Sequence, residues 1–108
     1  MDEQEFQTRA QSSLESLYRK LAAASDKYEF EPDFNAGALA IEFDEPKGKF
    51  VVSPNAPVRQ IWLSAHSKSF KLAWDAARNS FVLPETKQTL DEVVAEAIEK
   101  QIGEPVSL

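Results

Sequence analysis

The 108-residue sequence contains no cysteine and only one histidine, His66. Without cysteine the chain cannot form disulfides, thiolate metal sites or a cysteine nucleophile. One histidine also excludes a His pair or a His-rich metal site. His66 lies in the polar stretch 64–69, where we expect it to be solvated. Any metal bound by this chain is therefore expected to rely on oxygen ligands, which favour hard ions over copper or zinc.

Glycine-rich loops and long apolar runs are also missing. The three glycines are not clustered, and we find no phosphate loop and no Ser-His-Asp arrangement. The longest apolar runs are a few residues, far short of the ~20 that cross a bilayer. The first residues, MDEQEF, are acidic, which does not suit a signal or transit peptide. We expect a cytoplasmic protein that is not a hydrolytic enzyme.

Positive charge is scarce relative to negative charge. The chain has 12 Lys and Arg against 18 Asp and Glu, a net charge of −6. This excess argues against nucleic acid and anionic membranes as partners and permits cations and basic protein surfaces. The length predicts a single domain over residues 1–108.

Apolar spacing predicts two helices that flank a run of strands. Spacings of three and four predict helices over residues 2–24 and 90–102, each with a capping-box pattern at its start. Alternating residues predict six strands near 28–34, 38–44, 50–52, 59–64, 70–74 and 81–83, with turns at 35–37 and 45–48. Pro32 places the first strand at a sheet edge. This order predicts an α+β two-layer sandwich in which both helices cover one face of a six-stranded antiparallel sheet.

The first two predicted strands carry carboxylates on one face. Glu29, Glu31 and Asp33 share one parity, and so do Glu42 and Asp44. If Phe34 pairs with Leu39, then Glu31 faces Glu42 and Glu29 faces Asp44. Like charges in such pairs destabilise a hairpin, and a bound cation would remove the repulsion. Asp26 could join this group. The alternative is a solvated edge that discourages pairing with other chains.

Trp62 is the second feature with functional interest. The alternation that buries Ile61 and Leu63 turns Trp62 toward the solvent face, beside Gln60 and Ser64. An exposed Trp on a sheet is a frequent protein-binding anchor. The alternatives are a loop, near 54–57, that covers the ring, or the opposite parity.

The sequence around Trp62 resembles the frataxin family, especially its bacterial CyaY-type members. The most specific part is Gln60-Ile61-Trp62-Leu63 preceded by Pro57. Residues 35–41 are similar to the family's first hairpin, and residues 90–92 and 103–108 are similar to the bacterial members. The resemblance runs nearly end to end and implies the same α–β–α sandwich.

This resemblance implies a weak iron-binding adaptor for iron–sulfur cluster assembly that acts on a cysteine desulfurase and its scaffold protein. Glu29, Glu31 and Asp33 correspond to the first-strand part of the family's acidic ridge. Gln60 and Trp62 correspond to the partner-binding face, with Asn55 and Lys71 nearby. The helix end 18–25 carries Arg19 and Lys20 where the family is rich in acids.

The resemblance further implies a monomer that could form oligomers with iron, and no organic cofactor. The candidate metal ligands are Asp26, Glu29, Glu31, Asp33, Glu42 and Asp44. Two other functions stay open: a ferroxidase-like oxidation of ferrous ion with storage of the iron, and a metal-independent acidic interaction module.

Overall fold

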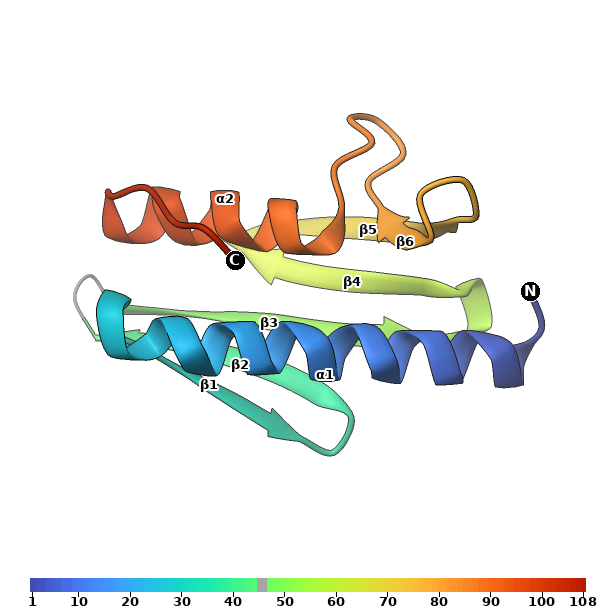
Figure 1. Ribbon diagram of the computed structural model, residues 1–108, viewed down its shortest axis with the longest axis horizontal. Helices are drawn as coiled ribbons and strands as arrows, with labels where there is room; N and C mark the ends of the chain where they lie inside the picture. Colours follow the sequence, from blue (N-terminus) through green and yellow to red (C-terminus); the bar gives the residue numbers. More distant parts are fainter. Residues whose placement is uncertain (45–46) are drawn as a thin grey trace.

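Six antiparallel strands form one sheet in chain order, and two helices cover one of its faces (Figure 1). The computed structural model describes residues 1–44 and 47–108. The helices are α1 (Glu3–Tyr28) and α2 (Leu90–Ile102). The strands are β1 (Phe30–Asn35), β2 (Ala38–Asp44), β3 (Lys47–Asn55), β4 (Gln60–Ala65), β5 (Lys68–Asp75) and β6 (Ser80–Val82), and the 3₁₀ turn η1 (Ala56–Val58) joins β3 to β4. The predicted two-layer α+β sandwich is confirmed.

Helix α1 buries the stripe that its spacing predicts. The stripe consists of Phe6, Ala10, Leu14, Leu17 and Leu21, which are at most 1% exposed. Asp2 caps the helix by accepting a hydrogen bond from the Glu5 amide, 2.7 Å. The helix ends at Tyr28 instead of the predicted residue 24, because the segment after Leu21 is rich in alanine, the best helix former. Tyr28 therefore belongs to the helix and not to the first strand.

Helix α2 has the predicted bounds and the predicted cap. Thr89 accepts a hydrogen bond from the Glu92 amide, and the Glu92 carboxylate accepts one from the Thr89 amide. This reciprocal bonding holds the Glu92 carboxyl in its charged form and lowers its pKa. Gly103 ends the helix in the left-handed conformation, with φ 75°, which glycine adopts without steric cost.

The strand register follows the predicted hairpins, but β3 and β5 are longer than expected, and β5 covers Lys68–Asp75 instead of 70–74. Phe34 pairs with Leu39, and β1 lies at the sheet edge, as Pro32 predicts. Strand β3 extends to Asn55 instead of stopping at Val52. The ladder between β2 and β3 ends at the pair Leu39–Val52. No residue of β2 therefore lies opposite Pro54, which has no N–H to donate to a neighbouring strand. The fourth strand starts at Gln60, since Arg59 is left-handed with φ 55°, and the sixth is Ser80–Val82, one residue earlier than predicted. The predicted turn at 45–48 falls partly on residues 45 and 46, which lie outside the described residues, while Lys47 and Gly48 belong to β3.

The core lies between the helices and the inner face of the sheet. Ile61 and Leu63 are fully buried there, while the outward residues Glu31, Glu42 and Lys71 are exposed. Neither helix is long and apolar enough to span a bilayer, within residues 1–44 and 47–108. Because both helices cover the inner face, the outer face of the sheet is where polar side chains and Trp62 are available to other molecules.

Candidate functional site: an acidic corner and a tryptophan-bearing sheet face

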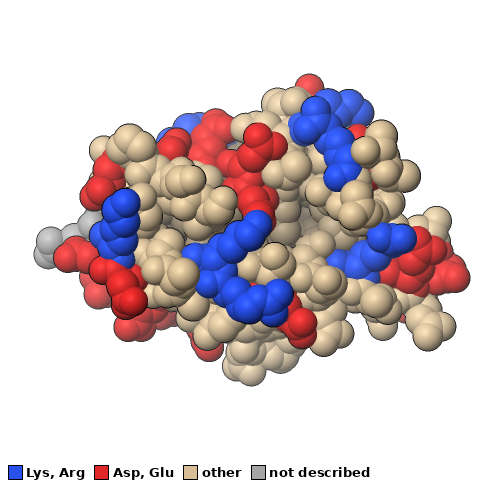
Figure 2. Space-filling view, viewed as in Figure 1, with Lys and Arg blue, Asp and Glu red and all other residues tan. Residues whose placement is uncertain are grey.

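Four carboxylates surround one hollow where α1 meets the first hairpin. Glu29, Glu31, Glu42 and Asp44, which we call the acidic corner, line a hollow of about 500 Å³ together with Ser25 and Phe30. In Figure 2 acidic side chains gather at the left end of the visible face, where α1 ends and β1 begins. All four residues of the corner are exposed, so the hollow is open to water.

The corner is built by a helix end and a strand register. Glu29 caps α1 in the left-handed conformation, with φ 53° and ψ 53°, and this turn reverses the chain into β1. Glu31 then faces Glu42 across the β1–β2 ladder, as predicted. Directly opposed residues of an antiparallel pair have Cβ atoms about 4.5–5.5 Å apart, which makes this a repulsive pair.

The predicted pairing of Glu29 with Asp44 is wrong. The β1–β2 register begins at the pair Phe30–Phe43, because Glu29 still belongs to the helix cap and has left-handed dihedral angles. Both carboxylates nevertheless line the hollow. They adjoin Phe30 and Phe43, the last pair of the ladder, so they lie near each other just beyond its end.

The other two predicted ligands lie outside the hollow. Asp33 is exposed on β1 opposite Ala40, and Asp26 is exposed on the last turn of α1. Ser25, which the sequence did not suggest, lines the hollow. Nothing in the local pattern points to Ser25, since its position depends on how far α1 extends.

Two of the four acids of the corner lie opposite a lysine of β3, since Asp44 pairs with Lys47 and Glu42 with Lys49. Lys49 on β3 lies opposite Glu42, with 3.9 Å between its Nζ and the Glu42 Oε1, and both side chains are more than half exposed. Within the described ranges, Glu29, Glu31 and Asp33 form no ion pair. No three Asp, Glu or His side chains converge as a ready-made metal group, as far as the described residues go. The corner is a concentrated anionic surface and not a closed coordination cage.

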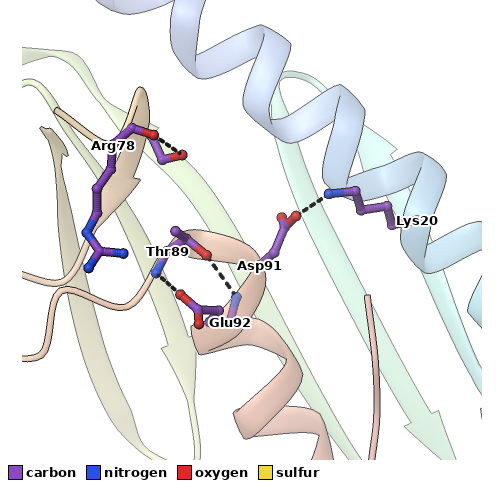
Figure 3. Close-up of polar contacts among 6 residues, drawn as sticks. Lys20, Arg78, Thr89, Asp91 and Glu92 are labelled. Atoms are coloured by element: carbon purple, nitrogen blue, oxygen red, sulfur yellow. Dashed lines mark hydrogen bonds and ion pairs between the residues drawn. The ribbon is translucent and has the colours of Figure 1, made fainter. Parts of the chain in front are cut away.

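Lys20, one of the basic residues of α1, connects the two helices. Lys20 donates a hydrogen bond to the Asp91 carboxylate at the start of α2, so one of the two cations noted above ties the helices together (Figure 3). Basic side chains lie over the middle of α1 in Figure 2. The end of α1 and the first hairpin thus carry one of several acidic patches, and the middle of α1 between them is basic (Figure 2).

Trp62 lies on the outer face of the sheet, as the alternation predicts, but it is half-buried there and not fully exposed. Its Nε1–H donates a hydrogen bond to Gln60 Oε1, 2.8 Å, and the Lys71 Nζ lies 4.9 Å from its ring centroid. Asn55 pairs with Gln60 across β3 and β4. The alternative in which residues 54–57 cover the ring is not supported, because Pro54 and Ala56 line a hollow with α1 on the opposite face.

The sequence predicts that His66 is solvated. In the structure His66 is exposed but also makes two contacts with the protein. Its Nε2 lies 3.0 Å from the Ala97 carbonyl oxygen of α2, and its ring packs edge-on against Phe50 at 5.1 Å between centroids. His66 and Ser67 form the tip of the β4–β5 hairpin, with φ 54° and 61°. The hairpin tip folds against α2, so this histidine has a structural role that its polar neighbours conceal.

Comparison with known proteins yields one family. A family model described as the frataxin-like domain matches residues 1–104. The chain is 25% identical over 103 residues to the iron-sulfur cluster assembly protein CyaY of Thioalkalivibrio sulfidiphilus, covering 95% of each chain. The chain is also 27% identical over 112 residues to mitochondrial frataxin of Arabidopsis thaliana. This match covers 100% of the chain, which spans 59% of the plant protein's length.

A solved structure supports the same fold. The frataxin from Psychromonas ingrahamii, studied as a model of stability modulation within the CyaY protein family, superposes with a TM-score of 0.76 at 22% identity. The match covers 99% of this chain and 97% of the other. At this identity the likeness concerns the fold alone.

Proposed function

This chain belongs to the frataxin-like family and is of the bacterial CyaY type, and on that premise we propose that it is an iron-binding adaptor of iron–sulfur cluster assembly. Relatives of the family are named as cluster assembly proteins and not as enzymes. Residues 1–108 are proposed to work as one domain, in the cytoplasm, as a monomer that could associate when iron is added. The iron is cargo held at the surface and not a resident cofactor.

The acidic corner is the observation that carries this proposal. Four carboxylates around one hollow of about 500 Å³ offer only oxygen ligands, which suit hard cations such as ferrous and ferric ions. A bound cation would offset the repulsion between Glu31 and Glu42. The carboxylates are exposed and would have to move to coordinate an ion, so binding is expected to be weak. Asp33 and Asp26 lie close along the chain and would extend the anionic surface.

The proposed partners are a cysteine desulfurase and the scaffold protein on which the cluster is built. A net charge of −6 would steer the chain toward a basic surface of the desulfurase. Trp62 would anchor the complex, because a half-buried aromatic ring on a sheet face adds contact area at little cost in ordering. Gln60, Asn55 and Lys71 surround this anchor, within or beside the same sheet face.

Titration with ferrous ion under anaerobic conditions tests the iron part of the proposal. In ¹⁵N NMR spectra, backbone amides of residues 29–33 and 42–44 are expected to broaden first, since paramagnetic relaxation falls steeply with distance. The variant with Glu29, Glu31 and Asp33 all replaced by Lys should lose this broadening. Replacement of three exposed acids elsewhere, Glu3, Glu85 and Glu104, by Lys is the matched control, because it changes the net charge by the same amount. Equal broadening in the triple variant and the wild type would refute the assignment.

A metal-independent interaction module is the second candidate function. It is favoured by the absence of a converging metal group among the residues that the structure describes and by the cations on α1. A pull-down with the cysteine desulfurase, with and without ferrous ion, separates the two, because only the iron adaptor requires the ion for its full effect. Oxygen uptake with ferrous ion above the buffer rate would instead indicate a ferroxidase-like enzyme.

A further inference from the structure

The indole N–H of Trp62 is already occupied within the protein. Trp62 and Gln60 are two residues apart on β4, so their side chains lie on the same outer face of the sheet. The Nε1–H donates to the Gln60 Oε1 at 2.8 Å, a normal length for such a bond. A partner that covered this ring would therefore meet an indole whose only polar group has no proton left to donate.

Lys71 contributes a second contact to the same ring. It lies directly opposite Trp62 on β5, and its Nζ is 4.9 Å from the ring centroid, within the range of a cation–π contact. Opposite Trp62 on β3 is Ser53, whose side chain is short. The indole is thus held from one end by Gln60 and from one strand by Lys71, and the β3 side offers no comparably long side chain.

We infer that Gln60 is a positioning residue that fixes the Trp62 ring for a partner that supplies no hydrogen-bond acceptor to the indole. This role rests on the proposed partner function of Trp62. Two χ1 rotamers are common for side chains on strands, and ordering a free side chain on binding reduces affinity. The bond from Gln60 restricts the ring before the partner arrives. Gln60 would therefore influence binding through Trp62 and not through a contact of its own.

Hydrogen exchange of the indole N–H tests the positioning in the free protein. The two indole signals, from Trp62 and Trp74, can be followed in one ¹⁵N spectrum, and Trp74 serves as the internal control. In Gln60→Leu the Trp62 indole should exchange with solvent several times faster, while the Trp74 signal keeps its rate. Gln60→Glu retains an acceptor oxygen and should restore slow exchange. An unchanged Trp62 rate in Gln60→Leu would overturn the positioning role.

A double-mutant cycle with the cysteine desulfurase and scaffold protein tests the consequence for binding. Gln60→Leu should weaken Kd about three- to tenfold, as expected for the loss of one orienting hydrogen bond. In the Trp62→Ala background the same substitution should have no further effect. Lys68→Met, which removes an exposed β5 cation outside the Trp62 contact, is the control and should bind like the wild type.

The cycle distinguishes the positioning role from the proposed function. If Gln60→Leu weakens binding equally with and without Trp62, Gln60 contacts the partner itself and the positioning role is refuted. If the wild type binds neither protein, the proposed partner function fails, and the indole exchange still decides the positioning role. Thermal unfolding of each variant verifies that the fold is intact, which is expected because Gln60 and Trp62 lie on the outer face of the sheet and Lys68 is exposed.

Discussion

Replacing Glu31 by Lys should stabilise the protein, because it converts a repulsive cross-strand pair into an attractive one. Glu31 faces Glu42, and two unit charges about 5.5 Å apart in water interact by roughly 0.8 kcal/mol before screening. The substitution removes that repulsion and adds an attraction of similar size. Exposed pairs deliver only part of the Coulomb energy, and Lys49 already attracts Glu42 weakly. We therefore expect a gain of about 0.5–1 kcal/mol in the free energy of unfolding.

The assay is thermal and urea unfolding followed by circular dichroism at low ionic strength. For a domain of this size the gain corresponds to a rise in Tm of about 2–6 °C. Glu31→Gln should give a smaller gain, since it removes the repulsion without adding an attraction. Glu85→Lys changes the net charge by the same amount as Glu31→Lys, away from the acidic corner, and corrects for the general effect of reducing the charge of −6. In 1 M salt, where the Debye length is about 3 Å, the difference should largely disappear.

Two results would refute this reasoning. If Glu31→Lys were no more stable than Glu85→Lys at low salt, the acidic corner would carry no local repulsion. If the gain persisted in 1 M salt, its origin would be packing or strand propensity instead of charge. Either result would also remove the electrostatic reason for a cation to bind at the corner.

Three further predictions concern the fold. Ser67→Gly should raise the free energy of unfolding by about 0.5–1 kcal/mol, because Ser67 has φ 61° and glycine adopts this conformation without strain; Ser64→Gly, in β4, is the control and should lower it, and a loss in Ser67→Gly would contradict the reasoning. The pKa of the Glu92 carboxyl is lowered in the folded state by its hydrogen bonds to Thr89. The stabilisation by this carboxylate is therefore complete above the ordinary pKa of 4.5 and is lost as the pH falls through the lower folded-state pKa. In urea unfolding between pH 7 and pH 2, Glu92→Gln should lose less stability in acid than the wild type, and parallel curves for the two proteins would contradict this reasoning. Leu17→Ala should cost about 2–5 kcal/mol in urea unfolding, because Leu17 is 0% exposed and the cavity cannot fill; a cost below 1 kcal/mol would mean that α1 is not packed as described.

Most of the fold was predictable because it depends on short-range patterns. The stripe of α1, the cap of α2 and the Phe34–Leu39 register each follow from spacings of two to four residues along the chain. The errors concern the residues at which one element ends and the next begins. The end of α1 was predicted too early because the change of period at Tyr28 resembles a strand, whereas the helix continues until Glu29 reverses the chain. The length of β3 was underestimated because residues 53–57 were expected to interrupt the strand, whereas Pro54 lies beyond the last pair with β2 and still pairs with Ile61 of β4.

The sequence by itself determined the α+β class, the buried stripes of the helices and the edge position of β1. It also placed the acids and Trp62 on the outer face, because alternation along a strand and helical spacing assign each side chain to a face. Only the tertiary structure decided which acids meet in one hollow and how Trp62 is held. Glu29 reaches the acidic corner from the C-cap of α1, and Lys71 reaches the indole from the directly opposite position on β5. Such contacts depend on where elements end and how they pack, and these distances in space are not encoded in any local period of the chain.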